Sequence, residues 1–163
     1  MKINFYNAKC QKTTKKELFG LCDDENQTPA YIEFKNTDKL NATVINPTQK
    51  IIIHTAIDNC IEILRENGKM DNRCDSMLTY PDNIVFVELK NKGSGWISEG
   101  IKQIEATIIT FKNSHDLFSV KHKRAFVANR RHPNFQVTDN EKAKIFWDKF
   151  RVRLNINSVI NIK

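Results

Sequence analysis

The sequence predicts an α/β fold in which helices flank a mixed central sheet. Residues 84–87 form a continuous apolar run, which is typical of a strand buried on both faces. Apolar residues further along recur at the spacing of a helix that packs on a core, and they are Ile97, Ile101, Ile104, Ile108 and Phe111. Residues 124–129 predict a further strand, which should pair in parallel with the first through a right-handed crossover.

The segment before the apolar strand predicts a helix, a short strand and a turn. Ile53, Ile57, Ile61 and Leu64 have helical spacing, and Gly68 follows where a helix would stop. The β-branched run at 51–53 leaves a strand at the start of this helix as an alternative. Residues 75–80 then read as a strand, and the turn at 81–83 folds it back onto residues 84–90.

The two ends of the chain complete the predicted order of elements. Residues 1–46 are polar and irregular, apart from a short strand predicted at 2–6, and we assign them to an N-terminal extension. Residues 47–163 form the predicted core. Its last helix has a capping box at Thr138 and Glu141 and an apolar face around Phe146 and Phe150. Residues 152–162 alternate like one amphipathic strand.

Length and composition narrow the class of protein. The chain has 163 residues, enough for one domain with a substantial core. It has no apolar stretch near the roughly 20 residues of a membrane span and no apolar segment of signal-peptide type at its start. Its 4 cysteines lack a CxxC pair, which argues against a zinc site or a disulfide framework and favours a reducing cytoplasm.

The net charge of +7 favours a polyanionic partner, and we expect a nucleic acid. Basic residues occur in several separate runs along the chain. The candidates for phosphate contact are Lys92, Lys121, Lys123, Arg124, Arg130 and Arg131. For each run taken alone, a solubilising surface is an equal alternative.

Three side chains around the predicted hairpin carry the candidate chemistry. Glu88 and Lys90 are two residues apart on one strand and therefore point to the same face, while the turn returns Asp75 toward them. Two carboxylates can hold a hard divalent cation, and the ammonium can stabilise negative charge. This combination suits hydrolysis of a phosphodiester.

Asp75 followed by Glu88-Leu89-Lys90 after an apolar strand resembles the PD-(D/E)XK nuclease superfamily. The resemblance implies a restriction endonuclease-like core and a metal-dependent endonuclease that cuts DNA. It implies that Mg²⁺ or Mn²⁺ binds Asp75, Glu88 and the backbone carbonyl of Leu89. It adds Gln103, on the following helix, to the catalytic residues.

The resemblance also implies an assisting acidic residue on the first helix, for which Asp58 and Glu62 are the candidates. One feature departs from the superfamily pattern, because Cys74 rather than proline precedes the first aspartate. This departure bears on the subfamily more than on the fold.

Several alternatives stay open at the level of sequence. A second Glu-x-Lys, Glu33-Phe34-Lys35, lacks both an upstream aspartate on an apolar strand and a following helix, so we reject it as the site. Asp75, Glu88 and Lys90 could instead form a solvated hairpin face with a surface ion pair. The chain as a whole is open to a reading as an inactive nuclease-like binding, immunity or regulatory protein. A homodimer that cuts both strands is a further option.

Overall fold

A seven-stranded mixed sheet forms the centre of the computed structural model, which describes residues 2–63, 72–137 and 139–163. Its strands, in spatial order, are β1 (Gln11–Thr14), β5 (Ile52–Ala56), β6 (Ser76–Tyr80), β7 (Asn83–Lys90), β8 (His122–Asn129), β10 (Arg153–Asn157) and β9 (Gln136–Val137). β7 pairs with β8, and β8 with β10, in parallel. The other pairs are antiparallel.

A second, four-stranded sheet lies against the first. Its order is β11 (Val159–Asn161), β4 (Ala42–Ile45), β2 (Leu18–Cys22) and β3 (Tyr31–Glu33). β11 and β4 are parallel and the other pairs antiparallel, so this sheet is also mixed. Two short 3₁₀ helices occur in this part of the chain: η1 (Ala8–Cys10) precedes β1, and η2 (Thr37–Lys39) lies between β3 and β4.

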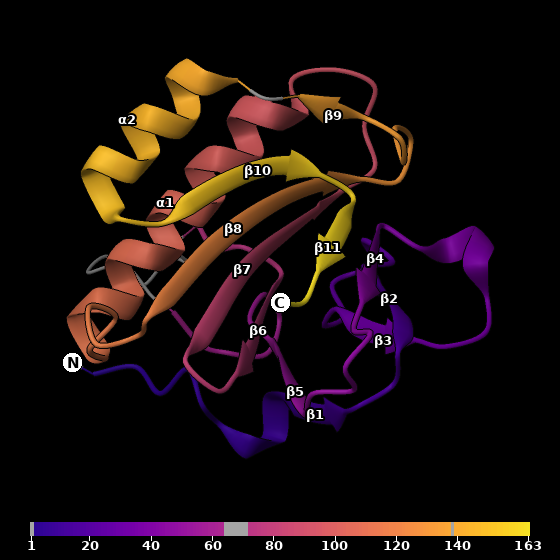
Figure 1. Ribbon diagram of the computed structural model, residues 1–163, viewed down its shortest axis with the longest axis horizontal. Coiled ribbons are helices and arrows are strands. Elements are labelled where there is room, and N and C mark those ends of the chain that lie inside the picture. Colours follow the sequence, from indigo (N-terminus) through magenta and orange to yellow (C-terminus); the bar gives the residue numbers. More distant parts are fainter. Residues whose placement is uncertain (1, 64–71, 138) are drawn as a thin grey trace.

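The central sheet separates two apolar cores. Helices α1 (Trp96–Ser114) and α2 (Asn140–Phe150) cover one face, and the small sheet covers the other (Figure 1). Because side chains alternate along a strand, Ile84 and Phe86 of β7 pack under the helices, whereas Val85 and Val87 pack against the small sheet. β7 is therefore buried on both faces, as its sequence predicts.

The α/β class and the mixed central sheet are confirmed. The helix predicted from the stripe that ends at Phe111 is α1, and the strand predicted at 124–129 is part of β8, parallel to β7. The helix predicted near the C-terminus is α2, although Asp139 is its N-cap. Thr138, the cap expected from the sequence, lies outside the described residues.

Three predicted elements differ from the structure. The helix expected from Ile53 onward is wrong, because residues 52–56 form β5 and residues 57–63 form no helix; Leu64 and Gly68 lie outside the described residues. The short strand expected at 2–6 is also wrong. The single strand expected at 152–162 is divided at Ser158 between two sheets, as β10 and β11.

The cysteines also depart from the expectation that they form no disulfide framework. Cys10 and Cys60 form a disulfide that closes a separation of 50 residues, while Cys22 and Cys74 are free and buried. The antiparallel pairing of β1 with β5 brings the two bonded cysteines together, because Gln11 lies opposite Thr55. No helix in the described parts of the chain is long and apolar enough to cross a membrane.

Candidate active site

Asp75 and Glu88 face each other across the β6–β7 hairpin. The ladder pairs Ser76 with Val87, so the next pair outward is Asp75 with Glu88. The two-residue turn at Pro81 and Asp82 sets this register, with Asp82 at a positive φ of 63°. Residues directly opposite each other in an antiparallel pair have Cβ atoms about 5 Å apart, which brings the two carboxyl groups together.

Lys90 and Gln103 complete a contiguous polar cluster on the face that α1 covers. The Lys90 ammonium lies 3.2 Å from Oε2 of Glu88 and donates a hydrogen bond of 2.5 Å to Oε1 of Gln103. The N–H of Leu89 donates to Oδ2 of Asp75 at 2.7 Å. All four side chains named by the resemblance, those of Asp75, Glu88, Lys90 and Gln103, therefore belong to one cluster.

The close approach of α1 to the sheet builds this cluster. A Cβ added to Gly100 would lie 2.6 Å from Cγ1 of Val127 and 3.5 Å from Cγ of Glu88, so this position needs a glycine. About two helical turns later, Oγ1 of Thr107 accepts a hydrogen bond from the N–H of Cys74 at 2.7 Å. The helix thus fixes the residue before Asp75 and also carries Gln103.

Burial dominates the electrostatics of the carboxyl pair. The exposed fractions of Asp75 and Glu88 are 5% and 2%. Burial raises the pKa of Glu88 to about 7, against the lowering effect of Lys90. Burial and the charge of Glu88 raise the pKa of Asp75 well above its usual value. At neutral pH the pair therefore holds a proton that a cation would displace.

The cluster offers a divalent cation an uncommitted oxygen. Oε1 of Glu88 is buried and has no hydrogen-bond partner in the described residues. Such an atom is costly unless an ion or water satisfies it. The Lys90 carbonyl accepts from the N–H of Arg130, on the β8 side of the strand. Because carbonyls alternate along a strand, that of Leu89 points to the opposite side, toward Asp75.

These donors fit a hard cation such as Mg²⁺ or Mn²⁺, whose ligands are oxygens. They amount to two carboxylates and one carbonyl. Within residues 2–63, 72–137 and 139–163, no three His, Cys, Asp or Glu side chains form a group that could hold a metal ion. The remaining coordination positions would belong to water and substrate.

Asp58 and Glu62, the candidates for an assisting acid, do not join the cluster directly. Asp58 accepts from Nε of Arg73 at 2.9 Å, and its charge raises the pKa of Glu88. Glu62 is exposed, and among the described residues no contact joins it to the site. The predicted helix that was to present both residues is absent here, which explains their positions.

Two asparagines that sequence reasoning missed hold the backbone at Lys90 and at Lys92. Asn41, which precedes β4, donates from Nδ2 to the Lys90 carbonyl at 3.1 Å. The amide of Asn129, at the end of β8, donates to the Lys92 carbonyl at 2.7 Å and accepts from the Arg131 N–H at 3.1 Å. The one signal for Asn129 in the sequence was its position as a polar residue at the end of an apolar strand.

The six basic residues expected to contact phosphate fall into two groups at opposite ends of the sheet. Lys92 follows β7, and Arg130 and Arg131 follow β8, so these three lie at the end that carries Glu88 and Lys90. Lys121 precedes β8, and Lys123 and Arg124 lie near the start of this strand. These three residues are therefore at the other end of the sheet. They do not form one continuous surface.

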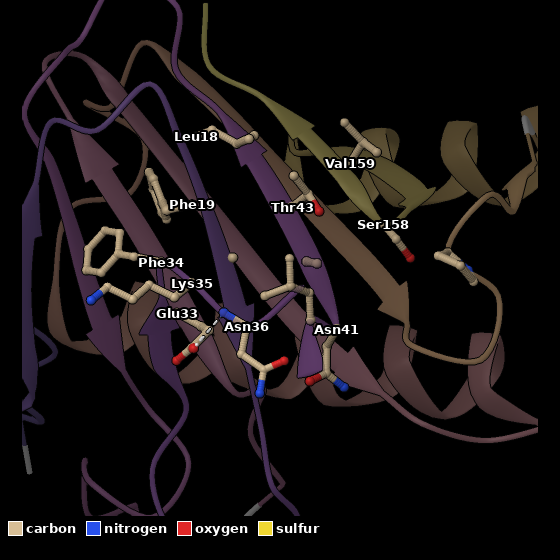
Figure 2. Close-up of a pocket in the computed structure, with 14 residues that line it drawn as sticks. Leu18, Phe19, Glu33, Phe34, Lys35, Asn36, Asn41, Thr43, Ser158 and Val159 are labelled. Carbon is tan, nitrogen blue, oxygen red and sulfur yellow. Dashed lines mark hydrogen bonds between the residues drawn. The ribbon is translucent and has the colours of Figure 1, made fainter. Parts of the chain in front are cut away.

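The Glu-x-Lys at 33–35 lies beside a different cavity, of about 310 Å³, on the small sheet. Figure 2 shows the hydrogen bond of 2.9 Å from the Asn36 N–H to the Glu33 carboxylate. Phe34 is 54% exposed, and the lining includes Leu18 and Val159. Glu33 thus stabilises a turn here.

The cluster around Glu88 therefore remains the candidate site. Comparison of the chain with protein-family models, with curated proteins and with solved structures gives no match.

Proposed function

We propose that the protein is a metal-dependent nuclease with a restriction endonuclease-like core that hydrolyses phosphodiester bonds, with DNA as its substrate. The observation that carries this proposal is the convergence of Asp75, Glu88 and Lys90 with an unsatisfied buried carboxylate oxygen. A buried carboxylate oxygen without a partner is costly, and a cation bound between Asp75 and Glu88 would offset that cost.

Each residue has a distinct role in the proposed reaction. Asp75, Glu88 and the Leu89 carbonyl hold Mg²⁺ or Mn²⁺. When bound, the ion acts as a Lewis acid that lowers the pKa of water and offsets charge on the phosphoryl oxygens. Lys90 would position the attacking water by donating a hydrogen bond to its oxygen, or would stabilise the negative charge that develops on the phosphoryl group. Gln103 holds the ammonium of Lys90 in place through its 2.5 Å hydrogen bond.

A non-catalytic nuclease-like binding protein is the second candidate. The near-complete burial of Asp75 and Glu88 favours it, because a substrate must approach carboxylates that are 5% and 2% exposed. The two candidates differ in one measurable property, which is cleavage that requires a divalent cation.

The test is incubation of the purified protein with supercoiled plasmid, single-stranded DNA and RNA, in Mg²⁺, Mn²⁺ or EDTA. We expect cleavage of DNA that EDTA abolishes. Asp75→Asn, Glu88→Gln and Lys90→Met should each lower the cleavage rate by a factor of about 100 or more. Calorimetric titration with Mn²⁺ should show binding to the wild type and to Lys90→Met but not to Glu88→Gln.

Matched controls are available on the surface. Lys112→Met removes an exposed charge from the last turn of α1, and Glu17→Gln removes an exposed carboxylate, both away from the cluster. Both should cleave at the wild-type rate. Cleavage that persists in two of the three site variants would refute the assignment, and Mn²⁺ binding without any cleavage would favour the second candidate.

A further inference from the structure

A basic cavity lies at the opposite end of the central sheet from Glu88 and Lys90. It has a volume of about 500 Å³ and is formed where β7 and β8 begin and where α2 ends. Asn83, the first residue of β7, lines it, whereas Lys90 is the last residue of the same strand. At about 3.3 Å per residue, the cavity is about 23 Å from the candidate active site.

Positive charge predominates in this cavity. Its lining includes Lys121, Lys123, Arg124, Arg151 and Arg153. The one acidic side chain in the lining is that of Asp82, while Lys50 donates a hydrogen bond to the C-terminal Lys163. In the described part of the chain, none of these five cations forms an ion pair, whereas Lys90 and Lys92 both pair with Glu99. Like charges gathered in a concave surface raise the local concentration of anions.

Aromatic groups, in place of carboxylates, hold the three guanidinium groups. Those of Arg151 and Arg153 lie over the ring of Trp147, at 5.7 and 5.0 Å from its centroid. Arg124 donates to the Tyr80 hydroxyl at 2.9 Å. Contacts of this kind orient a guanidinium and leave most of its N–H groups available, an arrangement suited to phosphate.

The backbone contributes to the same arrangement. Arg151 is the C-cap of α2 and has a positive φ of 58°, so the chain reverses there and returns along β10. This reversal places Arg153 opposite Arg124 in the β10–β8 register. Arg124 and Arg153, which are 29 positions apart, thereby present their guanidinium groups to one cavity, which no single basic run in the sequence indicates.

We propose that this cavity binds the phosphodiester backbone of a nucleic acid, as a second anchor remote from the site of cleavage. The inference rests on the proposed nuclease function for its choice of ligand. A strand that reached both sites would cover at least about 7 nucleotides, at about 3.4 Å per nucleotide. The affinity of the protein for an oligonucleotide therefore rises steeply once the chain exceeds that length.

The test measures binding in EDTA, so that it does not depend on catalysis. Fluorescence anisotropy would follow the binding of labelled single- and double-stranded oligonucleotides of 4, 8, 12 and 20 residues between 50 and 300 mM salt. The triple variant Arg124→Gln, Arg151→Gln, Arg153→Gln should bind the longest probe at least tenfold more weakly. The slope of log affinity against log salt should fall by about 2 to 3, because each lost phosphate contact removes about 0.7 to 0.9.

A control variant carries the same change of net charge elsewhere. Lys9→Gln, Lys15→Gln, Lys112→Gln alters exposed lysines outside both sites and should keep the wild-type slope. If the arginine variant fails to fold, Lys121→Glu replaces it, because Lys121 is exposed and packs in neither core. Equal affinities and slopes for the cavity and control variants would overturn the proposal.

Competition identifies the source of the phosphate. Unlabelled tripolyphosphate should displace the 20-residue probe only at concentrations far above those of an unlabelled 20-residue oligonucleotide. Equal potency of the two competitors, with no gain from chain length, would overturn the proposal in favour of a small polyphosphate ligand. Salt-sensitive, length-dependent binding in a protein that never cleaves would support the anchor while refuting the nuclease.

Discussion

Glu88 is the residue on which the candidate site depends most. Its carboxylate lies opposite Asp75, pairs with Lys90 through one oxygen and leaves the other oxygen unsatisfied. The sequence predicted that Asp75, Glu88 and Lys90 converge, because the hairpin register and the alternation of side chains are local properties. The burial of Asp75 and Glu88, which raises the pKa values of both, comes from α1 and the rest of the core.

The raised pKa of Glu88 predicts how metal affinity depends on pH. Binding of Mn²⁺ or Mg²⁺ requires the ionised form, and the pKa of Glu88 in the folded protein is about 7. Affinity should therefore rise by about tenfold or more per pH unit between pH 5.5 and 7, because Asp75, whose pKa is also raised, must ionise as well. Calorimetric titration with Mn²⁺ at several pH values measures this directly.

A rise of affinity with pH over this interval distinguishes a buried carboxylate from an exposed one. An exposed glutamate is already ionised above pH 5.5 and would give an affinity that is flat over the same interval. A flat profile would contradict the raised pKa. Lys112→Met, which leaves the cluster unchanged, should reproduce the wild-type profile.

Asn41 and Thr107 mark the limit of prediction from sequence at the residue scale. Each forms a hydrogen bond to backbone near the site that is distant in sequence, across 49 and 33 positions respectively. Neither belongs to a motif, and a polar residue near an apolar segment has many structural uses. Only the folded chain determines that they meet Lys90 and Cys74.

Among the elements, α1 was predictable and β5 was not. The apolar stripe of α1 extends over four turns and packs on a single core, so its period identifies it. Ile53, Ile57 and Ile61 have the same spacing, but they belong to a strand and the turn after it. The β-branched side chains at 51–53 favour a strand, and this preference outweighed the helical spacing of the isoleucines, which is accidental in this segment.

The position of α1 depends on Gly100, and this leads to a prediction at the scale of the element. Gly100→Ala should lower the free energy of unfolding by about 1 to 2 kcal/mol, because the new methyl group must displace Val127 or the helix itself. Denaturation in urea measures the change. A shifted helix should also carry Gln103 away from Lys90 and slow cleavage.

Gly93→Ala provides the matched control. A Cβ at Gly93 would have Nη1 of Arg131 as its nearest neighbour, at 3.8 Å, which is ordinary contact. This variant should be as stable as the wild type or slightly more so, since alanine restricts the unfolded chain. Equal stability of the Gly100 and Gly93 variants would show that α1 does not need the close approach.

At the scale of the whole molecule, the Cys10–Cys60 disulfide joins the N-terminal segment to the turn after β5. Four cysteines without regular spacing gave no signal for it, because the pairing depends on the β1–β5 ladder. A crosslink over 50 residues removes chain entropy from the unfolded state worth about 4 kcal/mol. Disulfides persist in oxidising compartments, so this bond bears on the redox compartment in which the protein functions.

Reduction should therefore lower the stability of the wild type. We expect dithiothreitol to decrease the free energy of unfolding by up to about 4 kcal/mol. The double variant Cys10→Ser, Cys60→Ser should start from the lower value and show no response to the reductant. Thiol titration of the unfolded, unreduced wild type should find Cys22 and Cys74 alone, and a response from all four cysteines would contradict the bond.

The small sheet has a consequence for any shortened version of the chain. It covers Leu78, Val85, Val87 and Leu89 on the face away from the helices, and Asn41 beside it supports the Lys90 carbonyl. A fragment that started at Pro47 would expose an apolar surface along the hairpin that carries the carboxylates. Such a fragment would aggregate before its cleavage activity could be measured. The shortest useful expression product therefore includes the first 46 positions.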